Sequence, residues 1–374
     1  MKPHAFPILL GLLLIPIPLR AQAPPPLPPA AEIRARFLKD LDRPRVPLDP
    51  REEDVPATGS EFARQSVSFA SEAHPDGSIE RVPALVVKPR DGADRGRRPA
   101  VIALHGTGGN KEGMKPWLEE LASRGFLVMA LDGRYHGERA GGRPGTEAYN
   151  DAIVRAWRAK PDEPATHPLY YDTVWDVWRA VDYLQARPDV DPDRIGLMGI
   201  SKGGIETWLA ASADDRIKVA VPAIAMQSFR WGLDHDRWKA RANTVRAAHE
   251  AVARERGEPE VTRDTCLALW PKILPGILDV YDGPSLVRLF AGRPLLIVNG
   301  ENDPNCPIEG AEIAFASARE AFHAAGADDR LKIMVAPKVG HVVTPEQHRA
   351  ILDWFTAWLK PTPPGGNSAP GQGL

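Results

Sequence analysis

Cysteine is almost absent from this sequence, which contains only Cys266 and Cys306 among its 374 residues. Two cysteines exclude a fold stapled by many disulfides, and their spacing matches no zinc-binding pattern. The sequence leaves undecided whether these two cysteines form one disulfide with each other, because it does not show whether their Cα atoms come within the roughly 7 Å that a disulfide requires. The cysteines therefore predict neither a disulfide scaffold nor a metal site.

An excess of charge of one sign is also lacking, since 47 basic and 49 acidic side chains leave a formal net charge of −2 at pH 7. Such a chain has no global positive field to attract nucleic acid or anionic lipid. The 43% hydrophobic residues suffice for a sizeable globular core. We therefore expect no nucleic-acid partner and a small-molecule partner in a local site, whereas the oligomeric state stays open.

Long apolar runs are lacking as well, apart from residues 6–19 near the N-terminus. Lys2 precedes this run and Ala21-Gln22-Ala23 follows it, which is the pattern of a cleaved export signal over residues 1–23. The run is shorter than the ~20 residues of a membrane span, so an uncleaved anchor is the weaker alternative. The sequence predicts a secreted or periplasmic protein that starts near Pro24 and has no integral membrane segment.

Two further stretches offer few apolar positions to a core. Residues 24–56 are rich in proline and charge and predict a loosely attached arm. Residues 361–374 are rich in proline, glycine and serine and predict a disordered tail. Residues 57–360 remain as one folded domain.

Within this domain, strand-like and helix-like segments alternate. The expected strands are residues 62–70, 81–87, 100–104, 126–131, 195–198, 219–224, 295–298 and 331–335. Most of these runs are apolar on both faces, as in strands buried between two layers of helices. The last helix has its start signals in Thr344, Pro345 and Gln347. The alternation predicts an α/β fold with a mainly parallel sheet covered by helices on both faces.

One segment, residues 227–293, separates the sixth and seventh expected strands and is too long for a simple connection. It has helical periodicity and several large aromatic side chains, Trp231 among them. We interpret it as a helical insertion over the carboxyl edge of the sheet, where ligands bind in open α/β folds. Its aromatic residues either shape a binding pocket or pack the insertion against the core.

The strongest motif is Gly199-Ile200-Ser201-Lys202-Gly203, which directly follows an expected strand and precedes a helix-like segment. This context is typical of a nucleophile elbow, where a serine is held in a strained turn. Residues two positions from the serine must be nearly free of side chain so that strand and helix can approach. We therefore interpret Ser201 as a catalytic nucleophile rather than a chance serine in a turn.

A serine nucleophile needs a base within hydrogen-bond reach and an acid that orients the base. His341 follows the last expected strand and precedes the last helix, so it is the candidate base. Glu301 and Asp303 follow the strand at 295–298, and we favour Asp303 because two more loop residues let it turn towards the histidine. An aspartate that only shapes its loop is the remaining alternative.

The developing oxyanion needs preorganised N–H donors. The backbone N–H of Lys202 is one candidate, and Thr107 in the loop His105-Gly106-Thr107-Gly108-Gly109 is the second, with Gly108 as the alternative. This glycine-rich loop lacks the spacing of phosphate-binding motifs. We therefore expect an oxyanion hole rather than a nucleotide site.

Charged residues gather in Asp132-Gly133-Arg134-Tyr135-His136-Gly137-Glu138, after the strand at 126–131. A histidine between two acidic residues suggests a metal, but Arg134 would repel a cation. We favour a structural role in which Arg134 pairs with Asp132 or Glu138. Tyr135 here and Trp231 in the insertion are the candidate substrate-binding residues.

These motifs together resemble the α/β-hydrolases, in particular the dienelactone-hydrolase-like and prolyl-oligopeptidase-like serine esterases. The resemblance extends from residue 81 to the last helix and includes the segments 229–231 and 303–307. It implies the catalytic triad Ser201, Asp303 and His341, the α/β-hydrolase fold and no cofactor. It does not imply a substrate.

The sequence departs from both named groups. Dienelactone hydrolases have a cysteine nucleophile where this chain has Ser201, which favours ester hydrolysis. Oligopeptidases have a large propeller domain, for which the residues before the core are too few, so a peptidase is the second hypothesis. The third is a non-catalytic binding protein of the same fold, whose signature would be a broken triad.

Overall fold

The computed structural model describes residues 27–56, 59–90, 96–163 and 166–360. The expected export signal at residues 1–23 and the expected tail at 361–374 lie outside these residues, so both stay predictions. Within the described part of the chain, no helix has the length and apolar character needed to cross a membrane. Cys266 and Cys306 are both buried and both free, so they form no disulfide with each other.

A nine-stranded sheet forms the centre of the molecule, in the order β1-β2-β3-β5-β4-β6-β7-β8-β9. The strands are β1 (Arg51–Val55), β2 (Phe62–Ala73), β3 (Ile79–Pro89), β4 (Arg98–Leu104), β5 (Leu127–Leu131), β6 (Val190–Ile200), β7 (Ile217–Ala223), β8 (Leu295–Gly300) and β9 (Leu331–Ala336). The strands from β5 to β9 pair in parallel, whereas β1, β2 and β3 add an antiparallel edge. The expected α/β architecture is confirmed.

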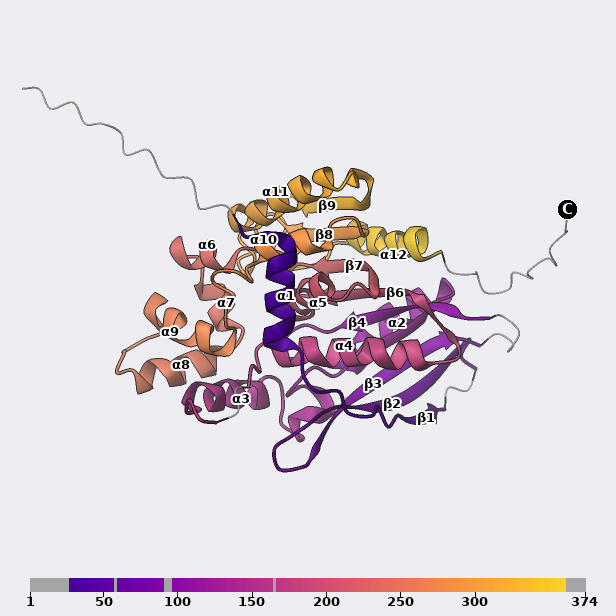
Figure 1. Cartoon of the computed structure of the whole chain (residues 1–374), viewed down its shortest axis with the longest axis horizontal. Helices are drawn as coiled ribbons and strands as arrows, with labels where there is room; N and C mark the ends of the chain where they lie inside the picture. The colour runs from indigo at the N-terminus through magenta and orange to yellow at the C-terminus, as the bar shows by residue number, and fades with distance from the viewer. Residues whose placement is uncertain (1–26, 57–58, 91–95, 164–165, 361–374) are drawn as a thin grey trace, which may run out of the picture.

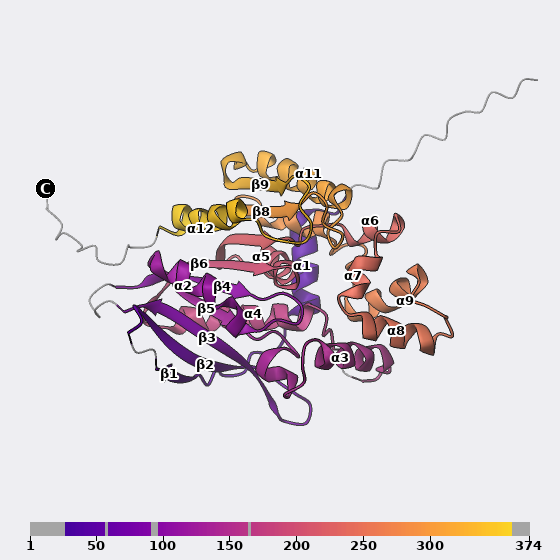
Figure 2. The ribbon, with the colours of Figure 1, turned by 180° about the vertical axis from the view of Figure 1, so that it is seen from behind.

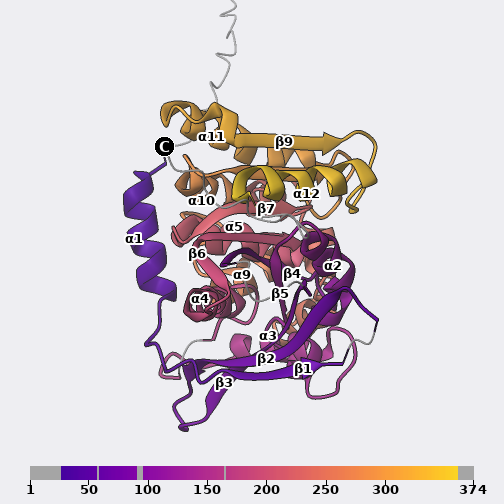
Figure 3. The same cartoon turned by 90° about the vertical axis from the view of Figure 1, so that its right-hand side faces the viewer.

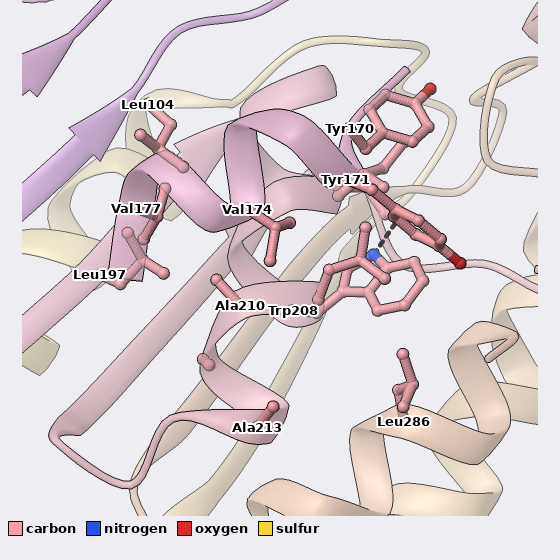
Figure 4. Close-up of a cluster of buried hydrophobic side chains, with 14 of the residues drawn as sticks. Leu104, Tyr170, Tyr171, Val174, Val177, Leu197, Trp208, Ala210, Ala213 and Leu286 are labelled. Carbon is pink, nitrogen blue, oxygen red and sulfur yellow. Dashed lines mark hydrogen bonds between the residues drawn. The ribbon is translucent and has the colours of Figure 1, made fainter. Parts of the chain in front are cut away.

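Helices cover both faces of this sheet, as Figure 3 shows. One layer consists of α1 (Ala30–Leu41), α4 (Tyr171–Ala186), α5 (Lys202–Ala213), α10 (Gly283–Leu286) and α11 (Ile308–Ala324), and the other of α2 (Lys115–Ser123) and α12 (Pro345–Leu359). Val174 and Val177 of α4 point towards Leu197 of β6 and Ala210 of α5 (Figure 4). The inner strands β4, β5, β7 and β8 are buried on both faces, which is why they are almost continuously apolar in sequence.

The remaining helices lie at one end of the sheet, as Figures 1 and 2 show from opposite sides. They are α3 (Glu147–Arg158), α6 (Phe229–Asp234), α7 (Lys239–Asn243), α8 (Arg246–Glu255) and α9 (Arg263–Ile273). Helices α6 to α10 all fall between β7 and β8, within the segment expected to be a helical insertion. The last helix begins as predicted, because Thr344 Oγ1 and Gln347 Oε1 each accept the other residue's backbone N–H.

The N-terminal arm differs from the expectation of a loose attachment. Helix α1 lies at the outer side of its helical layer (Figure 3), where it packs on α5 and α10 and buries Ile33, Phe37 and Leu41 in the core. The ring of Phe37 lies edge-on against Tyr281, with ring centroids 5.0 Å apart. Strand β1 adds an edge to the sheet. Three apolar residues at four-residue spacing are enough to bury one side of a helix, although proline and charge dominate the surrounding composition.

Candidate active site

Ser201 occupies the sharp turn between β6 and α5, at the carboxyl edge of the parallel strands. Its backbone has φ +56° and ψ −111°, a conformation that is strained for any residue with a side chain. The Ser201 N–H donates to the carbonyl of Ala223 on β7 at 2.9 Å, and its own carbonyl accepts from Ile205 N–H at 3.0 Å. These bonds hold the strained turn between two strands and a helix.

The glycines of the motif allow this turn to be tight, as the sequence predicts. A Cβ atom on Gly199 would lie 2.1 Å from the carbonyl oxygen of Gly203, and one on Gly203 would lie 2.4 Å from the carbonyl oxygen of Leu104. Both obstacles are backbone atoms, which cannot rotate away. Strand β6, helix α5 and strand β4 therefore approach each other only because these positions have no side chain.

Ser201, His341 and Asp303 form a continuous hydrogen-bonded relay. His341 Nε2 lies 2.7 Å from Ser201 Oγ, and His341 Nδ1 lies 2.7 Å from Asp303 Oδ2. The other oxygen of Asp303 accepts backbone N–H groups from Asn305 at 2.8 Å and Cys306 at 3.2 Å. The Asp303 carboxyl is fully buried, whereas the His341 side chain remains 24% exposed.

Glu301, the alternative acid, does not take part in this relay. Its carboxylate accepts the Lys338 backbone N–H at 2.7 Å and lies on the surface. The loops that contain Asp303 and His341 approach each other closely, since a Cβ on Gly300 would lie only 2.3 Å from the carbonyl oxygen of Gly340. Of the two carboxylates in this loop, Asp303 is therefore the one at the histidine.

The loop after β4 lies directly beside the serine. Gly106 and Thr107 line the same cavity as Ser201 and His341. Lys202 begins helix α5, and its side chain is buried with Nζ 2.6 Å from Glu206 Oε1. Thr107 thus lines the cavity of the serine, and Lys202 directly follows the serine in the chain, so the assignment of their N–H groups as oxyanion donors stays a prediction.

His105 connects the loop at 105–109 to a neighbouring loop through its ring nitrogens. His105 Nδ1 lies 2.8 Å from the carbonyl oxygen of Gly106, and its Nε2 accepts the Gly133 backbone N–H at 3.1 Å. Burial and the nearby Lys202 ammonium lower the pKa of His105 to about 4. The imidazole is therefore neutral at physiological pH and ties the loop at 105–109 to the loop at 132–138.

Acid should weaken the fold through this histidine. His105 is neutral in the folded protein down to about pH 4, whereas an unfolded histidine takes up a proton near pH 6.5. Its contribution to stability is thus complete above pH 6.5 and is lost as the pH falls towards 4. We expect the free energy of unfolding to drop by about 1–2 kcal/mol from this group between pH 7 and pH 5.

Urea unfolding at these two pH values measures the effect. The variant His105→Asn should lose this part of the pH dependence, whatever its stability at pH 7. His323→Asn is the matched control, since His323 is 82% exposed. An equal drop in the wild type and in His105→Asn would contradict the prediction.

A cavity of about 430 Å³ opens above Ser201. It is lined by Gly106, Thr107, Thr146, Ile200, Ser201, Ile224, Thr244, Asn305 and His341. Thr146 and Thr244 were not found from the sequence, because they come from distant segments and belong to no motif, and Asn305 lies in the predicted acid loop but was given no role there. The lining combines two isoleucines with three threonines and an amide, so it suits a small substrate with both apolar and polar parts.

The two expected substrate-binding aromatics do not line this cavity, which corrects the prediction. Tyr135 is half-buried in its loop, with its ring 6.0 Å from Cζ of Arg155. Trp231 stacks on His235 with ring centroids 4.3 Å apart and packs against Gly310. Both side chains are occupied in packing, and the insertion contributes Thr244, at the end of α7, to the cavity lining instead.

The charged loop at 132–138 has a bracing role, but with different partners from those expected. Arg134 pairs with Asp176 of α4, with Nε 2.9 Å from Oδ2, and not with Asp132 or Glu138. Asp132 and Glu138 both bind Lys111 Nζ, at 2.8 and 2.5 Å. These partners lie far away in the sequence, so a local pattern did not reveal them.

No cluster of three or more histidine, cysteine or acidic side chains in the described ranges has the arrangement to hold a metal ion. His136, the residue that suggested a metal, is buried, and its Nδ1 lies 2.8 Å from the carbonyl oxygen of Arg134. Burial and the Lys202 charge lower its pKa to about 2.

The fold and the serine turn define an α/β-hydrolase, and comparisons with known proteins agree. The sequence model of the acetyl xylan esterase (AXE1) family matches residues 66–230. That of the BAAT / acyl-CoA thioester hydrolase C-terminal family matches residues 178–347. The two matches overlap at the nucleophile turn. The chain thus has the α/β-hydrolase fold, and each of the two family models, one of esterases and one of thioester hydrolases, matches a little less than half of it.

Individual relatives are distant. The protein YtaP of Bacillus subtilis (strain 168) is 26% identical over 293 residues, which span 75% of this chain and 84% of YtaP. Acetyl xylan esterase 1 from Thermoanaerobacterium sp. JW/SL YS485 superposes with a TM-score of 0.60 at 21% identity, covering 88% of this chain and 93% of that one. The acetyl xylan esterase from Paenibacillus sp. R4 gives 0.59 at 19% identity, covering 88% and 92%. At such identities these structures establish the fold alone.

Proposed function

We propose that the protein hydrolyses carboxylic esters through an acyl-enzyme intermediate on Ser201. The observation that carries the proposal is the relay from Ser201 Oγ through His341 to the buried Asp303, with both linking distances at 2.7 Å. Serine needs such a base to become nucleophilic at neutral pH. The family models, one of an ester hydrolase and one of a thioester hydrolase, are consistent with acyl transfer.

In the proposed mechanism, His341 removes the proton of Ser201 as Oγ attacks the ester carbonyl. Asp303 holds the imidazole in orientation and stabilises its protonated form. The backbone N–H groups of Thr107 and Lys202 stabilise the oxyanion. His341 then gives its proton to the leaving alcohol, and a water molecule activated by the same histidine releases the acid and regenerates Ser201.

The cavity argues for a short acyl group. Its volume of about 430 Å³ is near the lower end of ligand pockets, which span about 300–1,000 Å³. Ile200 and Ile224 offer an apolar surface to an acyl chain, whereas the threonines offer hydroxyls to a polar alcohol. We propose short-chain esters of hydroxylated alcohols as the substrate class.

A fluorophosphonate probe tests the nucleophile directly, because it reacts with activated serines. We expect one adduct per chain, located by mass spectrometry on the peptide that contains Ser201. Acetyl, butyryl and octanoyl p-nitrophenyl esters, an acetyl thioester and an aminoacyl-proline amide should then be compared as substrates. The proposal predicts highest turnover on the acetyl ester. Failure of the probe to label would favour a binding protein, and preferential amide cleavage would favour a peptidase.

A further inference from the structure

Arg241 is a buried charged side chain close to the proposed acid. It lies on the short helix α7 of the insertion and is 5% exposed. Its Nη2 donates to the carbonyl oxygen of Asn305 at 2.8 Å and lies 3.4 Å from Cys306 Sγ, while its Cζ lies 5.8 Å from the Phe229 ring centroid. Neutral groups thus surround the cation, and no carboxylate in the described ranges forms an ion pair with it.

Gln227, at the exit of β7, completes this arrangement. In the orientation that satisfies both amide atoms, Gln227 donates to the carbonyl oxygen of Asn305 at 2.9 Å and accepts from Arg241 Nη2 at 2.9 Å. The carbonyl of Asn305 is therefore held by two side chains. Burial lowers the pKa of Arg241, but Tyr170, Cys306 and Asp303 outweigh it and leave the pKa raised, so the guanidinium stays charged.

The peptide that Arg241 holds is the one that positions the acid. Asp303 Oδ1 accepts the N–H groups of Asn305 and Cys306, while Arg241 binds the carbonyl of Asn305 and the thiol of Cys306. The short turn is thus fixed on one side by the carboxylate and on the other by the guanidinium. Cys306 Sγ in turn donates to the carbonyl of Ile224, a residue of the cavity lining, at 3.4 Å.

We propose that Arg241 is a positioning residue, which fixes the turn at 303–306 so that Asp303 stays aligned with His341. The proposal rests on the function proposed for Ser201. The insertion then has two roles: its residue Thr244 lines the cavity, and its residue Arg241 holds the loop that orients Asp303 towards His341. Because Arg241 does not line the cavity, its loss should lower kcat and leave KM nearly unchanged.

The experiment compares Arg241→Met, which removes the charge, with Arg241→Lys, which keeps it but cannot bind the same groups together. Arg293→Met is the matched control. Arg293 also donates to buried carbonyls, those of Asp214 and Ile217 at 2.9 Å, and packs on a phenylalanine ring, but it lies away from the acid loop. Urea unfolding of all variants separates effects on stability from effects on turnover.

Displacing a catalytic group by about 1 Å can cost on the order of a hundredfold in rate. We therefore expect kcat on p-nitrophenyl acetate to fall about 10- to 100-fold in Arg241→Met, with KM within about twofold of the wild-type value. Arg241→Lys should lose less, and Arg293→Met should keep the wild-type kcat in its folded fraction. Should Arg241→Met fail to fold, Arg241→Lys still decides, because it retains the buried cation.

Unchanged kcat in a folded Arg241 variant would overturn the proposal. It would also be overturned by a loss confined to KM, or by an equal loss in Arg293→Met. Failure of the function proposed for Ser201 is distinguishable, since it would leave the wild type itself without ester turnover and without labelling by the fluorophosphonate.

Discussion

Replacing Ser201 by alanine should abolish ester turnover and leave the fold intact. The substitution removes only Oγ, the atom 2.7 Å from His341 Nε2. Loss of the nucleophile of a serine relay costs roughly 10⁴- to 10⁶-fold in kcat. Alanine adopts the strained backbone at position 201 no less readily than serine, so we expect the free energy of unfolding to change by less than about 1 kcal/mol.

The measurement is turnover of p-nitrophenyl acetate at saturating concentration, together with circular dichroism and urea unfolding. Ser123→Ala is the control, because Ser123 is exposed at the end of α2 and its hydroxyl bonds only to the carbonyl of Glu120. That variant should turn over at the wild-type rate. Folded Ser201→Ala retaining more than about one hundredth of wild-type kcat would refute Ser201 as the nucleophile.

Replacing Gly199 by alanine should have the largest effect on stability. The added Cβ would lie 2.1 Å from the carbonyl oxygen of Gly203, and the nearest atoms all belong to the backbone of α5. Strand and helix would have to separate, which would disrupt the packing of α5 on the sheet. We expect a loss of about 4 kcal/mol or more in the free energy of unfolding, in the range of the most damaging single substitutions.

Gly232→Ala provides the comparison, since a Cβ there would have no atom within 4 Å and the residue lies in helix α6. Alanine favours helix over glycine by up to about 1 kcal/mol, so this variant should be as stable as the wild type or slightly more stable. The measurement is the urea concentration at the midpoint of unfolding, compared among the wild type, Gly199→Ala and Gly232→Ala. A Gly199→Ala protein that unfolds at the wild-type midpoint would show that the turn can widen at little cost.

Much of the fold was predictable because its signals are local in sequence. The strands β4, β5, β7, β8 and β9 and the second half of β6 are short, mainly apolar runs, and segments with helical period separate them. The start of α12 depends on a capping box that involves only Thr344 and Gln347. The arm was predicted wrongly because α1 contributes only three core residues, and composition over the whole segment hides them.

In the candidate site, too, some residues were predictable from the sequence and others were not. Ser201, Asp303 and His341 could be chosen from the sequence because each follows a strand, and parallel strands end at the same edge of a sheet. Between Asp303 and Glu301, loop length alone supported only a preference for Asp303. The tertiary structure decides that choice, because Asp303 Oδ2 lies 2.7 Å from His341 Nδ1, whereas Glu301 accepts the Lys338 backbone N–H on the surface.

What the sequence determined by itself is the order of the elements, the tight turn at Ser201 and the near balance of acidic and basic charge. Each of these depends on residue types at short spacing or on composition. Only the tertiary structure decided three other features: the residues that line the cavity, the ion-pair partners of Arg134, and the contacts of Arg241 with Asn305 and Cys306 in the turn that follows Asp303. They join side chains from segments far apart in the chain, and such contacts exist only once the sheet and its insertion have packed together.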